Sequence, residues 1–111
     1  MPLQRTETYS APATTVSWNC DQSITPFNVN VVCLLSNGGT VSYKLQYSYD
    51  SLDNPVLNDT NATWIDSNDI PAGTSASAET NFSTPIARVR LVIASLTGTL
   101  TMKMLQPMSV N

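Results

Sequence analysis

The chain has 111 residues, a formal net charge of −3 and only 12% charged side chains, about half the usual fraction. Its five cations form no basic run, which argues against nucleic-acid binding because that depends on cationic contacts to phosphates. No apolar run approaches the roughly 18 residues of a membrane-spanning helix. Ser and Thr together supply 27 residues, so uncharged polar side chains dominate the surface. We therefore expect one all-β domain that has neither nucleic acid nor membrane among its partners.

The N-terminal residues 1–13 contain two prolines and show no apolar period. This pattern predicts an extended N-terminal arm that is frayed in a free monomer or lies along a neighbouring subunit in an assembly. Residues 14–106 form the predicted sandwich domain, and residues 107–111 form a short C-terminal tail. The segment after Met1 has no apolar stretch typical of a secretory signal, which predicts folding in a reducing cytoplasm.

Alternating apolar and polar side chains predict the strands in chain order. The first covers residues 14–20, with Val16, Trp18 and Cys20 facing inward. The clearest covers residues 41–49, where Val and Leu share one face with three Tyr. The remaining expected strands are residues 27–35, 60–66, 76–83, 86–95 and 100–105.

The strand at residues 27–35 places Phe27 and four further apolar residues on one face, but Val32 and Leu34 occupy the opposite face. Apolar residues on both faces predict that this half of the strand is covered on both sides. Residues 36–40, Ser-Asn-Gly-Gly-Thr, predict a tight hairpin turn into the next strand.

About seven strands and no helical period predict an antiparallel β-sandwich, jelly-roll-like or Ig-like, that carries the N-terminal arm. Cys20 and Cys33 lie on neighbouring predicted strands, so a disulfide is geometrically feasible. Two buried free thiols that pack as small apolar groups are the preferred interpretation.

No histidine is present, which excludes Ser-His-Asp and Cys-His catalytic arrangements and the usual structural zinc site. No Gly-rich phosphate loop occurs either. We therefore predict no catalytic, cofactor-binding or metal-binding residue, no cofactor and no enzymatic activity. The alternatives are a calcium site and a glycosidase pair. The calcium spacing matches no known loop, so turn chemistry is preferred, and the glycosidase pair needs a deep cleft. The calcium site would use Asp50, Asp53, Asp59, Asp66 and Asp69.

Aromatic side chains offer a second type of binding surface, a platform on which sugars stack. Core packing is preferred for the three Tyr of residues 41–49, because they share the apolar face of their strand. Arg88 and Arg90 project from one strand face and would either anchor an interface or be solvated. The aromatic set comprises Tyr9, Trp18, Tyr43, Tyr47, Tyr49 and Trp64.

The order of these features resembles small β-sandwich proteins encoded among the structural genes of tailed bacteriophages. The family that it resembles most is the capsid-stapling decoration (cement) proteins of epsilon-fifteen-type short-tailed phages. The resemblance covers residues 14–106. It is carried by Leu-Gln-Tyr-Ser-Tyr-Asp (45–50), Trp-Ile-Asp (64–66), Pro-Ala-Gly-Thr (71–74), Pro-Ile-Ala-Arg-Val-Arg-Leu (85–91), Thr-Gly-Thr-Leu-Thr (97–101) and Leu-Gln (105–106).

The resemblance implies a late structural virion protein that folds in the host cytoplasm and binds the outside of the mature, DNA-filled head. Such proteins pair across symmetry axes and clamp neighbouring subunits of the major capsid protein, so a homodimer is expected. The alternative is a carbohydrate-binding or host-adhesion module on a virion surface. We expect the capsid contact to use the arm, the cationic strand face and the tail. The candidate interface residues are Arg5, Tyr9, Arg88, Arg90 and Met108.

Overall fold

The computed structural model describes residues 3–20, 22, 27–50 and 62–107. These ranges contain nine strands. No helix in them has the length and apolarity that a membrane crossing requires. The strands are β1 (Leu3–Tyr9), β2 (Ala13–Thr14), β3 (Trp18–Asn19), β4 (Val29–Leu35), β5 (Thr40–Ser48), β6 (Ile65–Asp66), β7 (Ala78–Phe82), β8 (Arg88–Thr97) and β9 (Leu100–Gln106).

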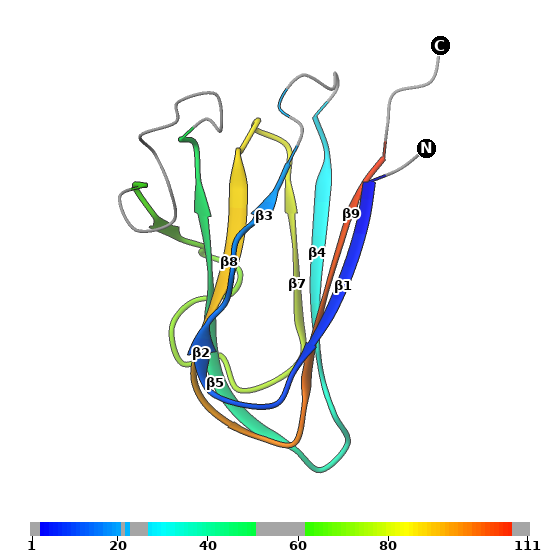
Figure 1. Cartoon of the computed structure of the whole chain (residues 1–111), viewed down its shortest axis with the longest axis vertical. Coiled ribbons are helices and arrows are strands. Elements are labelled where there is room, and N and C mark those ends of the chain that lie inside the picture. Colours follow the sequence, from blue (N-terminus) through cyan, green and yellow to red (C-terminus); the bar gives the residue numbers. More distant parts are fainter. Residues whose placement is uncertain (1–2, 21, 23–26, 51–61, 108–111) are drawn as a thin grey trace.

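The strands form two antiparallel sheets that pack face to face (Figure 1). The four-stranded sheet has the order β1-β9-β4-β7, and we call it sheet A. The five-stranded sheet has the order β2-β8-β5-β6, with β3 also paired to β8, and we call it sheet B. The predicted antiparallel β-sandwich is therefore confirmed.

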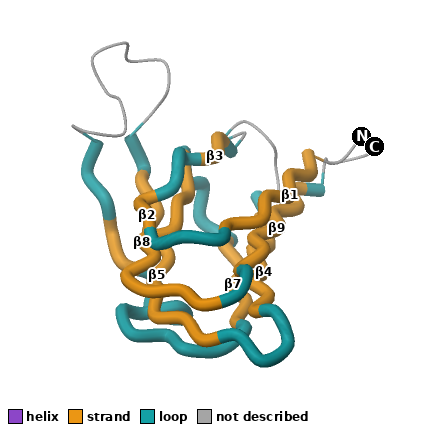
Figure 2. The backbone as a smooth tube through the Cα atoms, turned by 60° about the horizontal axis from the view of Figure 1, so that its bottom comes forward, coloured by secondary structure: helices purple, strands orange, loops and turns teal. Residues whose placement is uncertain are grey.

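The pairing of the strands distinguishes between the two predicted architectures. Four strand pairs form one antiparallel ribbon, namely β1–β9, β2/β3–β8, β4–β7 and β5–β6. The ribbon folds on itself so that β4 also pairs with β9 and β5 with β8, which produces the two sheets. This folded ribbon, in which most connections pass from one layer to the other, is the jelly-roll arrangement (Figure 2). The jelly-roll alternative, and not the Ig-like one, therefore describes the chain.

The core lies between the two sheets and consists of side chains that alternate inward along the long strands. On β5, Val41, Tyr43 and Leu45 are buried as the alternation predicted. Strands β4, β8 and β9 follow the same rule, and Ile70 adds a fully buried side chain from the segment after β6. That segment covers the outer edge of β5, where the Leu45 amide donates to the Ile70 carbonyl. The core of these strands includes Phe27, Val29, Val31, Cys33, Val89, Leu91, Ile93, Leu100, Met102 and Met104.

The turn at residues 36–40 does not form the predicted hairpin, because β4 belongs to sheet A and β5 to sheet B. The β8–β9 connection crosses between the sheets at the same end, so both form one corner of the sandwich (Figure 1). Ser36 ties them together: its amide donates to the Thr99 carbonyl, and its Oγ accepts from the Thr99 amide at 3.0 Å. Gly98 has φ +89°, and a Cβ on it would lie 2.6 Å from Ser36 Oγ. The glycines allow the two connections to pack closely together and do not form a hairpin turn.

The predicted N-terminal arm is wrong for residues 3–9, which form β1 and pair with β9 along their whole length, from Leu3↔Gln106 to Tyr9↔Leu100. Residues 13–14 form β2 on the edge of sheet B. An edge strand is held mainly by main-chain hydrogen bonds on one side, so it needs no apolar period. That is why its polar sequence resembled an arm.

The strand predicted at residues 14–20 is divided into β2 and β3. Trp18 and Cys20 are buried as expected, but Val16 is 79% exposed. Thr15 is buried in its place, because its Oγ accepts from the Leu91 amide at 3.0 Å. This side-chain contact interrupts the alternation. The divided strand and β1 account for nine strands where about seven were expected.

The two cysteines are free, buried thiols, as the preferred interpretation stated. Cys33 lies on β4 of sheet A, whereas the Cys20 amide donates to Ala87 beside β8 in sheet B. Burial raises the pKa of each thiol to about 12. The Cys20 Sγ packs 3.8 Å from the Met104 sulfur. Both groups therefore contribute to the core as small apolar side chains.

Candidate interaction surface

The outward face of sheet A carries exposed side chains from all four of its strands. The register places four side chains in each of two rows across β1, β9, β4 and β7. The first row is Gln4, Leu105, Asn30 and Asn81, and the second is Thr6, Lys103, Val32 and Glu79. Amides, hydroxyls and aliphatic groups thus alternate over one broad sheet face, which we call face A.

Face A carries apolar groups that no described part of the chain covers. Leu34 is 42% exposed and Leu105 is 37% exposed, while Val32 is half-buried. The prediction that β4 is covered on both faces is therefore wrong within the described chain. An apolar stripe beside hydrogen-bonding groups is typical of a surface that a partner covers.

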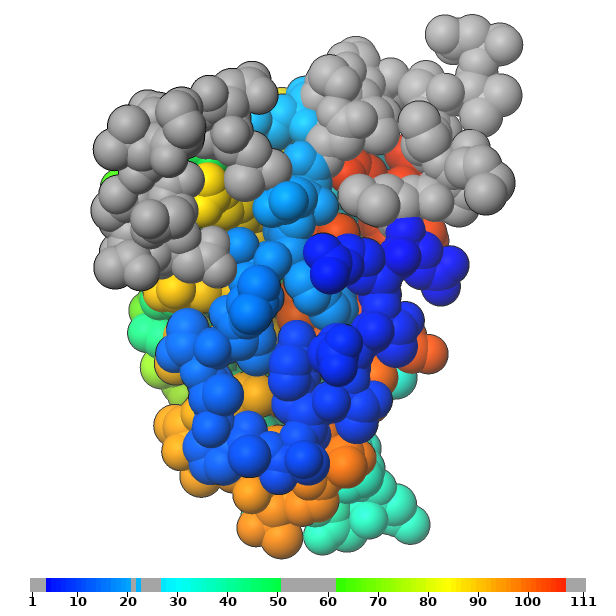
Figure 3. Space-filling model, viewed as in Figure 1, coloured from blue at the N-terminus to red at the C-terminus, as the bar shows by residue number. Residues whose placement is uncertain are grey.

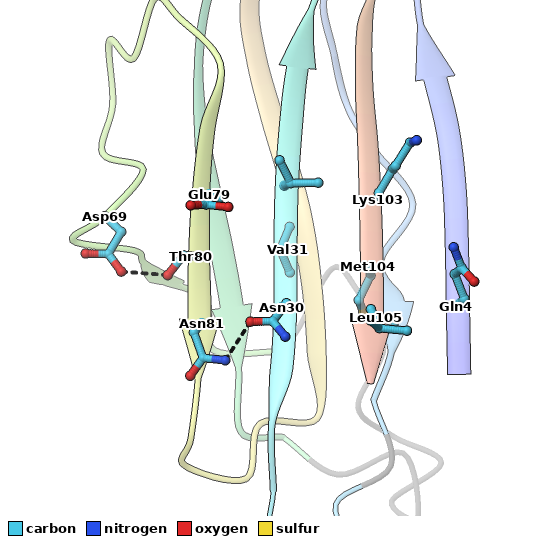
Figure 4. Close-up of a pocket in the computed structure, with 11 residues that line it drawn as sticks. Gln4, Asn30, Val31, Asp69, Glu79, Thr80, Asn81, Lys103, Met104 and Leu105 are labelled. Carbon is cyan, nitrogen blue, oxygen red and sulfur yellow. Dashed lines mark hydrogen bonds between the residues drawn. The ribbon is translucent and has the colours of Figure 1, made fainter. Parts of the chain in front are cut away.

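A shallow hollow of about 660 Å³ lies on this sheet. Its lining residues come from β1, β9, β4 and β7 and from Asp69 in the segment after β6 (Figure 4). Asn81 donates its amide to Asn30 Oδ1 at 2.7 Å and also contacts the Asn28 amide oxygen. At the edge of the hollow, Thr80 Oγ1 donates to Asp69 at 2.7 Å. These bonds fix the amide and carboxylate groups in place before any partner arrives.

The charges on face A do not cancel each other through a direct ion pair. Glu79 and Lys103 both lie opposite Val32, on either side of it, and both are exposed. Adjacent strands are about 4.8 Å apart, so these charges stand about 10 Å from each other across the stripe. One carboxylate and one ammonium thus flank an apolar centre, and both can bond to a partner.

The outward face of sheet B carries a side-chain network around Gln46. Gln46 donates to Asp66 Oδ1 at 2.9 Å and accepts from Arg90 Nε at 2.9 Å. Lys44 Nζ lies 3.3 Å from the same carboxylate. The Arg90 guanidinium lies over the Trp64 ring, 4.0 Å from its centroid. The hydrogen bonds from Gln46 and Lys44 lower the pKa of Asp66. These side chains are largely committed to one another.

The candidate interface residues predicted from sequence are spread over the molecule. Arg5 is exposed on β1, with its guanidinium 5.2 Å from the Trp18 ring centroid, whereas Tyr9 is half-buried against the core. The outward, exposed position expected for Arg88 is wrong, because its side chain is 2% exposed. Arg90 belongs to the network on sheet B. Met108 lies outside the described residues, as does most of the predicted tail.

The aromatic side chains do not gather into a platform on face A, since none of the residues that line its hollow is aromatic. Trp18 and Tyr43 are buried, Tyr47 and Trp64 are half-buried, and Tyr49 beyond the end of β5 is exposed. Core packing therefore accounts for Tyr43 and for most of Tyr47. Tyr43 Oη donates to the Ala76 carbonyl at 2.8 Å, and burial raises the pKa of Tyr43.

The loop carboxylates that the calcium alternative would use are divided between separate contacts. Asp50 accepts from the Thr63 amide, Asp66 belongs to the network on sheet B, and Asp69 accepts from Thr80. Asp53 and Asp59 lie outside the described residues. Among the residues that the structure describes, no group of three or more His, Cys, Asp or Glu side chains is arranged to hold a metal ion.

No protein-family model matches the sequence, and no curated protein matches it. The crystal structure of the SPBc2 prophage-derived protein YomS is similar at a TM-score of 0.49 and 14% identity. The alignment covers 96% of this chain and 94% of that chain. At this TM-score and identity, the similarity does not indicate a function for this chain.

Proposed function

We propose that this protein is a structural, non-enzymatic component of a bacteriophage head. In this role it binds the outer surface of the capsid, pairs with a second copy across a symmetry axis and joins neighbouring subunits of the major capsid protein. The sequence resemblance to capsid-stapling decoration proteins supports this role. The observation that carries it is face A, a broad strand surface whose exposed Leu34 and Leu105 have no cover within the described chain.

The chemistry of face A fits a flat protein partner. Side chains such as Asn30, Asn81 and Thr6 bond to main-chain groups without the desolvation cost that buried charges carry. The apolar centre around Val32 supplies the area whose burial stabilises the contact. A modest contact of this kind, repeated over a capsid and bridging two subunits each time, resists internal pressure through multivalency.

Carbohydrate binding remains the second candidate, because amides and carboxylates that point into a hollow also suit sugar hydroxyls. Sugar sites usually add an aromatic ring for stacking, and the hollow on face A has none among its lining residues. This difference favours the capsid contact over the adhesion module.

The test is co-sedimentation of the full chain with DNA-filled heads that lack it. We expect binding that saturates at a whole-number ratio to the capsid subunit. Leu34→Glu together with Leu105→Glu places charges on both sides of the apolar centre at Val32, and the affinity should fall about tenfold or more. The matched control is Val16→Glu, which changes an exposed apolar side chain away from face A and should bind normally.

Two outcomes count against the proposal. If the unaltered protein stays in the supernatant while it binds immobilised polysaccharide, the adhesion module replaces the capsid role. If the double variant binds heads as well as the control does, face A is not the capsid contact.

A further inference from the structure

Strand β1 is an open edge of sheet A. It pairs with β9 on one side, and no described segment lies along its other side (Figure 1). The space-filling view shows the dark blue residues of β1 at the front surface of the molecule (Figure 3). Side chains from Gln4 to Thr8 are all exposed. An edge of this length is a template for another strand.

The register shows which main-chain groups of β1 point away from β9. The Ser36 amide donates to Thr99, so Thr99 and every second residue after it direct their main-chain groups toward β4. The Leu35 amide, one residue before Ser36, donates to Ser77 Oγ on the opposite side of β4, as this alternation of main-chain groups requires. Leu100 and every second residue after it therefore direct their main-chain amides and carbonyls toward β1. By the same alternation, Gln4, Thr6 and Thr8 present their amides and carbonyls at the free edge.

The charges on β1 are arranged to match a second copy of the same strand. Arg5 and Glu7 share the inward-facing side of β1, two residues apart. When two copies pair antiparallel with Thr6 on the two-fold axis, residue i lies opposite residue 12 − i. Arg5 then faces Glu7 of the second copy and Glu7 faces its Arg5. Gln4 pairs with Thr8, and Thr6 pairs with Thr6.

This register also satisfies the main chain. The residues with free amides and carbonyls, Gln4, Thr6 and Thr8, pair only with one another and form the hydrogen-bonded positions. Arg5 and Glu7 fall at the alternate positions, where opposed side chains approach more closely. Shifting the axis to Arg5 or to Glu7 places two like charges directly opposite each other. Charge and hydrogen bonding therefore select the same alignment.

The charges are available for such pairing. Within the described part of the chain, Glu7 makes no ion pair. The Arg5 guanidinium lies over the Trp18 ring, which holds the cation beside the edge and leaves its remaining N–H groups for a carboxylate. Inward-facing charges on an edge strand also discourage pairing with unrelated strands. Arg5 and Glu7 thus disfavour pairing with unrelated strands and favour pairing with β1 of a second copy.

We propose that the protein forms a two-fold homodimer through β1, with Thr6 on the axis, so that two copies of sheet A become one continuous sheet. This inference deepens the proposed dimeric capsid role, because it names the surface and the register. It also places the two copies of face A side by side on one extended surface, and each copy can bind a different capsid subunit.

The experiment is sedimentation equilibrium of the purified full chain without capsids, at low and at high salt. We expect a concentration-dependent monomer–dimer equilibrium that weakens with salt, because the ion pairs are exposed. Glu7→Arg replaces both ion pairs with opposed cations, and Arg5→Glu replaces them with opposed anions. Each single variant should raise the dimer dissociation constant about tenfold or more.

Two combinations make the test specific to this register. The double variant R5E/E7R exchanges the charges and should dimerise like the unaltered protein. An equimolar mixture of the two single variants should form heterodimers, since each strand then carries the charges that the other lacks. Glu79→Arg is the matched control: it makes the same charge change on the opposite edge strand of sheet A and should leave dimerisation unchanged.

A protein that stays monomeric at the highest soluble concentration would overturn the β1 dimer. So would a dimer that E7R does not weaken, or single variants whose mixture stays monomeric while each variant retains its folded far-ultraviolet circular dichroism. The two proposals fail separately. A monomer that binds heads refutes the β1 dimer and the pairing of two copies but leaves head binding intact, and a β1 dimer that ignores heads refutes only the capsid role.

Discussion

Replacing Gly98 with Ala tests the corner where both strand pairs pass from one sheet to the other. At φ +89°, an L-residue is strained by about 1–3 kcal/mol. The new Cβ would also lie 2.6 Å from Ser36 Oγ, so that side chain must move. Its movement breaks the bond from the Thr99 amide, which costs about 0.5–1.5 kcal/mol more. We therefore expect Gly98→Ala to lower the free energy of unfolding by about 1.5–4.5 kcal/mol.

The assay is equilibrium urea unfolding, and the matched control is Gly38→Ala in the same corner. Gly38 also has a positive φ, +78°, but a Cβ there meets nothing within 4 Å. It should therefore show the backbone strain alone. Combining Gly98→Ala with Ser36→Ala removes the oxygen that the new methyl meets. The double variant should be more stable than the two single effects predict by addition.

If Gly98→Ala proved no more destabilising than Gly38→Ala, the close approach would contribute nothing and the reasoning about Ser36 would be wrong. An additive double-mutant cycle would lead to the same conclusion, since it would show no coupling between the two positions.

Three further predictions concern buried and paired groups. Tyr43→Phe removes the donor to the Ala76 carbonyl and should lower the unfolding free energy by about 1–2 kcal/mol in urea titrations, with no change in fold by circular dichroism. With pKa values of about 12, Cys20 and Cys33 should not react with a disulfide reagent at pH 8 until denaturant is added. Because their pKa values are raised from 9.0, stability should fall as pH rises from about 9 toward 12, and this fall should be smaller in a Cys→Ala double variant. The lowered pKa of Asp66 stabilises the fold above the usual carboxyl pKa of about 3.9, and this contribution is lost as pH falls through the folded value. Thermal melts of Asp66→Asn should therefore approach those of the unaltered protein in acid, and a constant difference at all pH values would contradict this.

The long strands were predictable because each buries one face. On β5 and β9 the apolar residues recur at every second position, and the buried side chains Leu45 and Met102 fall where the alternation places them. Strand β1 was missed for the opposite reason, since its side chains from Gln4 to Thr8 are exposed and it is held through main-chain bonds to β9. Turn chemistry also has a limit: the glycines at residues 38–39 indicate a sharp change of direction but not whether the next strand stays in the same sheet.

The interaction surface was harder to predict from the sequence than the fold was. Val32 and Leu34 gave a signal, because apolar residues on the second face of β4 imply a cover. Whether the chain itself supplies that cover depends on contacts between distant segments. The same limit applies to Arg90, whose position over Trp64 is set by the packing of β6 against β5 and of β5 against β8. Charge alone could not distinguish that committed side chain from a free one.

The order of the strands has a consequence for how the chain is made. Strand β9, the most C-terminal of the described strands, lies between β1 and β4, and β8 lies in the interior of the other sheet. Until β9 is in place, β1 has no neighbour among the described strands of sheet A, and β4 is paired only with β7. The earlier strands of sheet A therefore keep unpaired edges until β9 pairs with them, and unpaired strand edges favour aggregation during folding.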